Sequence, residues 1–178
     1  APPLLSHYVY SIYALDVFKQ TKEDGNKTEM LLAEQKRKQI LTSGITFAEY
    51  MDQLDVKCQF HYCETNEEKD RVVQLSQKTN QFNFTTERLT AFPQKPQEVL
   101  VVHVADRYGD YGLVGVMIFS RIGNVIELHN MMLSCRALGR GVPETMLREI
   151  SRIALKCGCD AVAINFKQSG KNLPAANL

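Results

Sequence analysis

Two glycines and two arginines lie between a predicted strand and a predicted helix. Arg136, Gly139 and Gly141 have the spacing RxxGxG, and Arg140 stands between the glycines. Glycines let backbone N–H groups approach a ligand closely, and a helix start carries a partial positive charge. The arginines could add charge-assisted hydrogen bonds. The segment therefore suits a diphosphate group, although a tight turn from a strand into a helix needs glycine in any case.

Three further reactive side chains precede or enter this segment. Glu127 and His129 lie two residues apart on the predicted strand, so we expect them on one face of it. A solvated or hydrogen-bonded strand residue is the alternative for each. Cys135 is close to the helix start, where a thiolate would be stabilised, so a covalent acyl intermediate is conceivable. Packing in the core is the alternative for this cysteine.

The composition limits the classes of function. The chain has 178 residues, 44% of them hydrophobic and 23% charged, with a formal net charge of +1. These values are typical of a soluble protein with one domain, or one domain and an appendage. Neither a basic field for nucleic acid nor an apolar run of about 18 residues for a membrane span occurs. We expect no nucleic-acid or membrane partner, and the absence of an initiator Met suggests a piece of a longer protein.

The cysteines and histidines indicate neither a disulfide framework nor a metal site. The five cysteines have no CxxC pairs, which favours a reducing compartment and a cytoplasmic location. Cys157 and Cys159 have no second pair at finger-type spacing, and His7, His61 and His103 are scattered along the sequence. The sequence therefore predicts no metal in this chain.

The order of predicted elements indicates a three-layer α/β (α+β) fold. Residues 1–55 are expected to be an N-terminal appendage or linker with a helix at 28–41, an early aromatic stretch at 1–18 that docks on the main domain, and a helical turn at 46–51. Residues 56–178 would form the main domain. It is expected to begin with a strand at 56–62, a helix with a capping box at Thr65 and Glu68, and a short helix from Thr85 or Thr86 to Leu89. Three strands follow at 98–105, 113–121 and 125–135, joined by a loop at 106–112 and a tight turn at 123–124. The last expected elements are a helix from Pro143 to Gly158 and a strand at 160–165.

This order, together with RxxGxG after the long strand, resembles the fold of the GNAT acyltransferases. In those proteins such a segment joins the fourth strand to a helix and holds the diphosphate of acyl-CoA. A dinucleotide-binding unit competes, but GxGxxG is missing and the preceding strands are linked by hairpins. The resemblance implies a central, mostly antiparallel mixed sheet flanked by helices, with the last strand missing from this chain. It also implies that the cofactor contacts are Leu133, Cys135, Arg136, Gly139, Arg140, Gly141 and Asn172.

Four longer strings resemble the C-terminal part of FkbH-like proteins. They are QKTNQFN at 77–83, DRYGD at 106–110, SCRALGRG at 134–141 and KNLP at 171–174. Such proteins have an N-terminal haloacid-dehalogenase-like (HAD, subfamily IIIC) domain before a GNAT-like domain, and the best-known members load a glyceryl unit onto an acyl carrier protein. The resemblance implies acyl-CoA or phosphopantetheine as cofactor. As partners it implies an acyl carrier protein or a small-molecule acyl acceptor, and the HAD-like domain, whose DxDx(T/V) motif does not occur in this sequence.

The resemblance also implies roles for individual residues. Glu127, or else His129, would deprotonate an amine or hydroxyl that attacks the thioester, and backbone N–H groups of the strand before Arg136 would hold the oxyanion. The residues expected to border the acceptor are Lys78, Asn80, Asn83, Asp106 and Arg107, with helix capping and turn formation as the alternative. The tyrosine that customarily acts as general acid would lie beyond Leu178. A second hypothesis is a non-catalytic module that presents carrier-protein substrates to the HAD-like domain.

Overall fold

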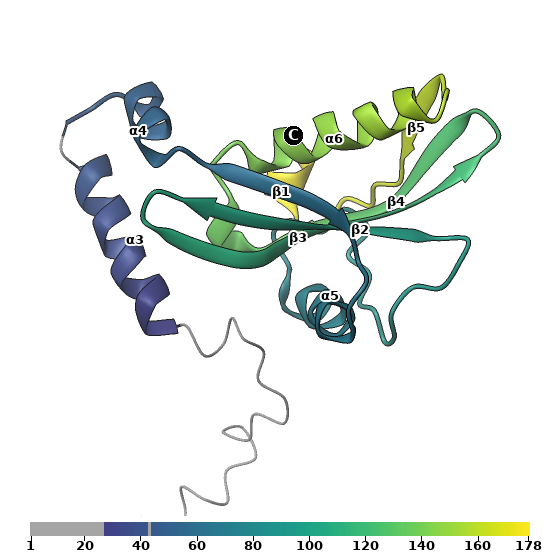
Figure 1. The fold of residues 1–178 in the computed structure, drawn as a ribbon, viewed down its shortest axis with the longest axis horizontal. Helices are drawn as coiled ribbons and strands as arrows, with labels where there is room; N and C mark the ends of the chain where they lie inside the picture. Colours follow the sequence, from purple (N-terminus) through teal and green to yellow (C-terminus); the bar gives the residue numbers. More distant parts are fainter. Residues whose placement is uncertain (1–26, 43) are drawn as a thin grey trace, which may run out of the picture.

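One mixed sheet of five strands organises the computed structural model, which describes residues 27–42 and 44–178 (Figure 1). The strands lie across the sheet in chain order. Neighbouring strands pair antiparallel from β1 to β4, whereas β5 pairs parallel with β4. The predicted mixed α/β architecture is therefore confirmed. The strands are β1 (Lys57–Tyr62), β2 (Glu98–Asp106), β3 (Gly109–Ile122), β4 (Val125–Leu133) and β5 (Ala161–Ile164).

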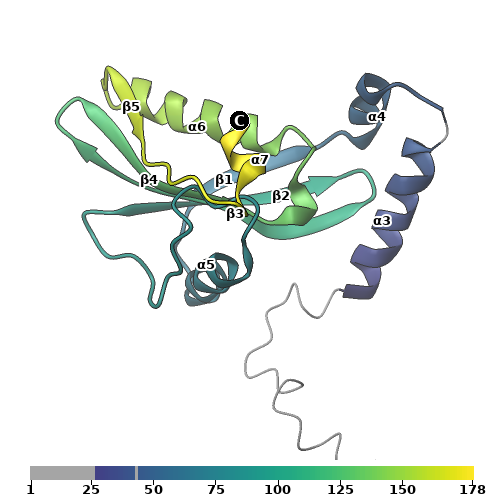
Figure 2. The same cartoon turned by 180° about the vertical axis from the view of Figure 1, so that it is seen from behind.

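Helices cover both faces of this sheet (Figure 2). On one face α5 (Asn66–Lys78) buries Val72 and Leu75 against β2, β3 and Met132 of β4. On the other, α6 (Val142–Lys156) buries Met146 and Ile150 in a larger cluster that also takes in Ala175 of the short α7 (Leu173–Ala176). None of the described helices combines the length and apolar composition needed to cross a membrane.

Two further helices lie at the end of the sheet where β2 turns into β3 (Figure 1). In α3 (Lys27–Leu41), Ala33 and Arg37 are buried, whereas Leu31 and Leu41 are exposed. The following α4 (Phe47–Leu54) starts at a capping box between Thr46 and Glu49 and is longer than the predicted turn. The predicted docking of residues 1–18 lies outside the described residues, and the domain boundary near residue 55 stays a prediction.

The predicted helix from Thr85 or Thr86 to Leu89 is wrong. Phe82–Phe84 instead runs extended beside β4 and is called the closing segment below. Its two aromatic side chains are almost fully buried, which demands the alternating geometry of a strand. Thr86 then has a left-handed backbone with φ of 62°, a conformation in which a right-handed helix does not continue. After the two N-terminal helices, the order of strands and α-helices is therefore β1 α5 β2 β3 β4 α6 β5 α7.

The hairpin between β2 and β3 is shorter than the predicted loop at 106–112. The strands extend to Asp106 and from Gly109, so two residues remain in the turn. The Asp106 carboxylate closes this turn because its Oδ1 accepts from the N–H groups of Tyr108 and Gly109 at 2.9 and 3.0 Å. An aspartate that the sequence assigned to a loop is thus part of the sheet's end.

Candidate functional site

The segment between β4 and α6 exposes a row of backbone donors. A short 3-10 turn, η2 (Cys135–Ala137), leads into Gly139 and Gly141, whose φ angles are +70° and +68°. Residues other than glycine rarely adopt this backbone conformation. Among the described residues, no acceptor is bound by the N–H groups at positions 139–142, and no side chain caps α6. These donors and the helix dipole are suited to an anion.

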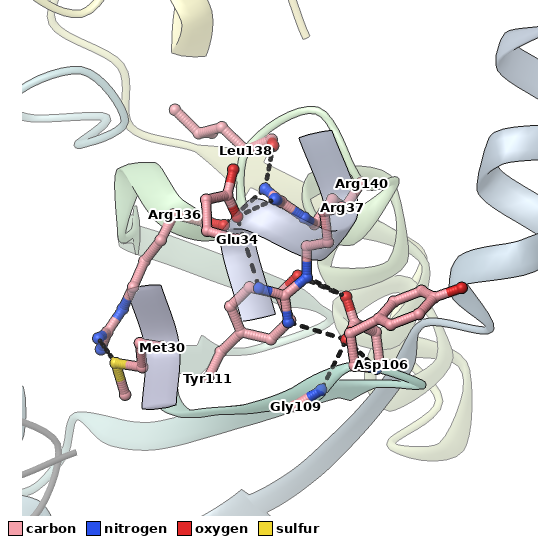
Figure 3. Close-up of polar contacts among 10 residues, drawn as sticks. Met30, Glu34, Arg37, Asp106, Gly109, Tyr111, Arg136, Leu138 and Arg140 are labelled. Atoms are coloured by element: carbon pink, nitrogen blue, oxygen red, sulfur yellow. Dashed lines mark hydrogen bonds and ion pairs between the residues drawn. The ribbon is translucent and has the colours of Figure 1, made fainter. Parts of the chain in front are cut away.

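Arg140 shapes this segment from behind. Its Nη1 donates to the carbonyl oxygens of Arg136 at 2.6 Å and Leu138 at 3.2 Å (Figure 3). Its Nη2 pairs with Glu34 Oε2 of α3 at 3.0 Å, and the guanidinium lies 5.2 Å from the centre of the Tyr111 ring. Only 10% of the side chain is exposed. Arg140 therefore holds the loop in shape, a different role from the predicted direct contact with a diphosphate.

Arg136 is the better placed of the two arginines for an anion. Its Nη1 contacts the Met30 thioether at 2.9 Å, and a thioether is a weak acceptor (Figure 3). Its Nε, like that of Arg140, is buried and has no hydrogen-bond partner in the described part of the chain, but Arg136 lacks the two carbonyl bonds and the ion pair that hold Arg140. Arg136 and Cys135 also line two adjoining grooves of 520 and 490 Å³, one with Lys78 and the other with Met30. A guanidinium so weakly satisfied is suited to a charged ligand in either groove.

The buried pair of Arg37 and Asp106 fastens α3 beside this segment. The guanidinium of Arg37 donates through Nε and Nη2 to both carboxylate oxygens, at 2.7 and 2.8 Å (Figure 3). The side chains are 4% and 0% exposed, and Tyr111 adds a hydroxyl donor at 2.6 Å. Burial alone would raise the pKa of Asp106, but these donors hold it below its usual range. Asp106 is thus fully engaged inside the protein, whereas Arg107 in the turn is exposed.

The two predicted proton-transfer residues meet on β4. A bulge at His129 interrupts pairing with β3, since Phe119 pairs with Leu128 and Ile118 with Asn130. His129 lies between two polar partners: Ser120 Oγ is 2.7 Å from its Nε2, and Glu127 Oε1 is 3.6 Å from its Nδ1. Glu127 in turn accepts from Asn165 Nδ2 at 3.0 Å. Ser120 and Glu127 can orient the imidazole of His129 for proton transfer. His129 also lines a groove of 760 Å³.

The outer edge of β4 is paired with the closing segment between the start of α6 and His129. Leu133 donates its N–H to Phe82 O at 2.9 Å, and Phe84 donates to Met131 O at 3.1 Å. The closing segment is also held from its other side, where Lys167 N–H donates to Phe84 O at 2.8 Å. Its Asn83 pairs with Met132. The predicted use of this strand's N–H groups for an oxyanion therefore meets an edge that is already paired, at Leu133 in particular.

Several solved structures of similar shape are acetyltransferases. The Escherichia coli ribosomal-protein-S18-alanine N-acetyltransferase aligns with a TM-score of 0.50 and 11% identity over 68% of this chain and 73% of that chain. The chain has a GNAT-like fold. The ribosomal-protein-alanine N-acetyltransferase of Brucella melitensis biovar Abortus 2308 aligns at 0.49 with 12% identity over 65% and 83%. AAC(6')-Iy, solved with a bisubstrate analogue containing CoA, aligns at 0.45 with 11% identity over 68% and 86%. No family model matches the chain, and neither does any curated protein.

Within this GNAT-like fold the remaining predicted site residues divide into two groups. Lys78 and Asn80 line the 520 Å³ groove together with Cys135 and Arg136, so four predicted residues meet there. Asn83 is buried and closes the turn after the closing segment, through bonds to Glu87 O and Thr86 N at 3.0 Å each. It therefore follows the turn-forming alternative.

Asn172 is also occupied within the protein. Its Nδ2 donates to the carbonyl oxygens of Asn83 and Lys167 at 3.0 Å each. Its Oδ1 accepts from the backbone and hydroxyl of Ser169 at 2.7 and 2.9 Å. The side chain is fully buried and its bonding capacity is used. Asn172 thus fastens the closing segment, with no polar atom left for the predicted cofactor contact.

Sequence reasoning missed several partners of the site. Ser120 could have been found, because the two-residue turn Gly123–Asn124 sets a register in which position 120 faces position 127. For Glu34 and Met30 of α3 the sequence holds no comparable signal. The expectation that the histidines lie scattered is wrong for His61 and His103, whose rings stack with centres 5.2 Å apart.

Proposed function

We propose that this GNAT-like domain binds the diphosphate of an acyl-CoA at the start of α6 and transfers the acyl group to an amine or hydroxyl. The observation that carries the proposal is the row of N–H groups at positions 139–142, without acceptors in the described residues and next to the weakly satisfied Arg136. The fold supports it, since the Escherichia coli protein of similar shape is named an N-acetyltransferase. A diphosphate matches these donors in charge and geometry.

The proposed chemistry uses the residues on β4. With Glu127 beside its Nδ1, His129 accepts the proton of the acceptor's amine or hydroxyl at Nε2, which exchanges its contact with Ser120 Oγ for the acceptor. The new bond forms at the thioester carbonyl carbon, the carbon–sulfur bond breaks, and the thiolate leaves and takes up a proton. For the acyl group to reach His129 from the α6 start, the arm must run past the closing segment.

The closed edge of β4 favours a second candidate. A chain that holds a charged headgroup at α6 while Phe82–Phe84 blocks the strand would bind CoA or a phosphopantetheinyl carrier protein without turnover. It would then serve a HAD-like domain of the same polypeptide. The FkbH-like strings support this setting for either candidate, with an acyl carrier protein as partner and a glyceryl-type unit in secondary-metabolite or surface-glycan synthesis.

Calorimetric titration with CoA and acetyl-CoA tests the site. Gly139→Ala should weaken CoA binding about tenfold or more, because a strained loop loses donors to a charged group. Gly158→Ala is the matched control: its φ is +66°, and in both glycines an added Cβ meets no atom within 4 Å. Equal CoA affinity in the two variants would show that the diphosphate does not bind at this loop. No binding of CoA or of a pantetheinylated carrier by the parent chain would overturn both candidates.

Acyl turnover then separates the enzyme from the binding module. If the domain is an acyltransferase, His129→Gln should lower turnover about a hundredfold or more while leaving CoA affinity unchanged, since the side chain lies away from α6. Glu127→Gln should have a smaller effect of the same kind. CoA binding in a parent chain that turns over no acyl group, with amine and carrier-protein acceptors alike, would favour the module.

A further inference from the structure

Two histidines and a glutamate meet on the α5 face of the sheet, at its β1 edge. His61 comes from β1, His103 from β2 and Glu68 from the first turn of α5. Their ligand atoms all lie within 4.8 Å of one another. Glu68 Oε1 is 2.6 Å from His61 Nε2 and 4.0 Å from His103 Nε2. This cluster shares no residue with the proposed acyl-transfer site.

The sheet and the helix cap bring these side chains together. In the register of β1 and β2, Gln59 faces His103 and His61 faces Val101, so the histidines are diagonal neighbours on one face. Their rings stack at an interplanar angle of 25°. Glu68 stands at the third helical position of α5, and the capping box turns its side chain back over this face. The cluster therefore follows from backbone geometry as well as from side-chain choice.

The carboxylate is oriented as a metal ligand is. Oε2 accepts the N–H groups of Glu64 and Thr65 at 3.1 and 3.2 Å, which leaves Oε1 directed at the histidines. In metal sites such second bonds fix the ligand's position. Burial would raise the pKa of Glu68, but the bond from His61 and the two backbone donors lower it to about 2. The carboxylate is therefore ionised at neutral pH.

We propose that His61, Glu68 and His103 bind a divalent transition-metal ion, with Zn²⁺ as the first candidate. Two imidazole nitrogens and one carboxylate oxygen form a ligand set that such ions prefer. Tetrahedral ligands about 2.0–2.1 Å from zinc stand about 3.3 Å apart, so the 2.6 Å contact must widen and the 4.0 Å contact must shorten by less than about 1 Å each. The separation of the two imidazole nitrogens, which is within 4.8 Å, must change by less than about 2 Å. We expect rotations of these partly exposed side chains to supply the shifts.

The site is also open to an ion. The side chains of His61 and His103 are 44% and 33% exposed, and that of Glu68 is 18% exposed. An ion can enter from solvent and keep water as a fourth ligand. A bound ion would join β1, β2 and α5, so it should stabilise the folded chain.

Metal titration of the full chain, stripped with a chelator and kept reduced, tests the proposal without any activity assay. We expect one equivalent of Zn²⁺ to bind in calorimetry and to raise the melting temperature. His61→Ala and His103→Ala should each weaken binding about a hundredfold. Glu68→Gln should do the same, while its amide oxygen can still accept the cap bonds.

The control variant is His129→Ala, which also removes a histidine beside a glutamate and should leave Zn²⁺ affinity unchanged. Co²⁺ provides a second readout because ligand-field absorption reports imidazole and carboxylate ligands, whereas a thiolate charge-transfer band would place the ion at cysteines. That band, or equal affinities in the parent and in His61→Ala and His103→Ala, would overturn the proposal. So would the absence of a bound equivalent of Zn²⁺ in the parent chain.

Discussion

The start of α6 and the outer edge of β4 are neighbours in the chain but differ in their backbone. At positions 139–142 the N–H groups find no acceptor within the described residues, whereas the edge at Met131 and Leu133 is paired with the closing segment. The first region can receive an anion as it stands. The second can receive an extended arm only if Phe82–Phe84 moves away. If the proposed function holds, the site for the CoA headgroup is open, whereas the path from it to Glu127 and His129 is closed by the closing segment.

The largest expected effect tests the ion pair of Arg37 and Asp106, which fastens α3 beside the start of α6. Asp106→Asn removes the charge that faces the buried Arg37 and should cost about 3–5 kcal/mol in unfolding free energy. Urea denaturation measures it. Asp110→Asn, in the same hairpin but exposed, should change stability by less than about 0.5 kcal/mol. Equal costs for the two variants would mean that the Arg37 pair does not fasten α3.

The same pair predicts a pH dependence. The pKa of Asp106 is lower in the folded chain than the value of about 3.9 expected when unfolded. Its contribution to stability is therefore present above the unfolded value and is lost as the pH falls through the folded one. The difference in unfolding free energy between the parent and Asp106→Asn should shrink steadily under acid titration. A difference that is constant down to low pH would contradict the assignment.

The next effect tests the closed region. Asn172→Ala removes four bonds that tie the closing segment and the Lys167 and Ser169 backbone, which should cost about 2–4 kcal/mol. Amide hydrogen exchange at Phe84 and Leu133 should accelerate. If an acyl-CoA arm uses the freed edge, CoA affinity measured by calorimetry should rise. Asn177→Ala, at an exposed position at the other end of α7, should do none of this.

The smallest effect is a gain in stability. Thr86 holds a left-handed backbone at φ 62°, which costs a β-branched residue about 1–2 kcal/mol. Thr86→Gly should relieve that cost, less the entropy of glycine, for a net gain of about 0.5–1 kcal/mol in denaturant unfolding. Thr85→Gly should instead destabilise, because its backbone is not left-handed. A loss in both variants would show that the turn after the closing segment depends on the Thr86 side chain.

Local signals predicted most elements of this fold. Alternating residues were enough to predict β1, the Gly123–Asn124 turn was enough for the hairpin of β3 and β4, and helical spacing after Pro143 was enough for α6. The same local reasoning failed at Thr85–Leu89, where a capping residue and helix formers are outweighed by the burial of Phe82 and Phe84. The burial of the closing segment depends on residues that are far from it in the chain.

The candidate site shows the same division. The loop with Gly139 and Gly141 was predicted because its conformation depends on residue types that are adjacent in sequence. The occupied bonds of Asn172 and the contacts of α3 with Arg136 could not be predicted, since they join residues far apart in the chain. Nor could the approach of His61 to His103, which needs the register of two strands.

The sequence by itself determined the order of all strands and of most helices, and the glycine-containing loop between β4 and α6, because periodicity and backbone freedom are properties of neighbouring residues. Only the tertiary structure decided which backbone groups remain open and which side chains meet. The closing segment pairs with β4 because its backbone satisfies the edge groups of Met131 and Leu133, and because the pairing buries Phe82 and Phe84. This pairing depends on the whole sheet, so it cannot be predicted from any single segment of the sequence.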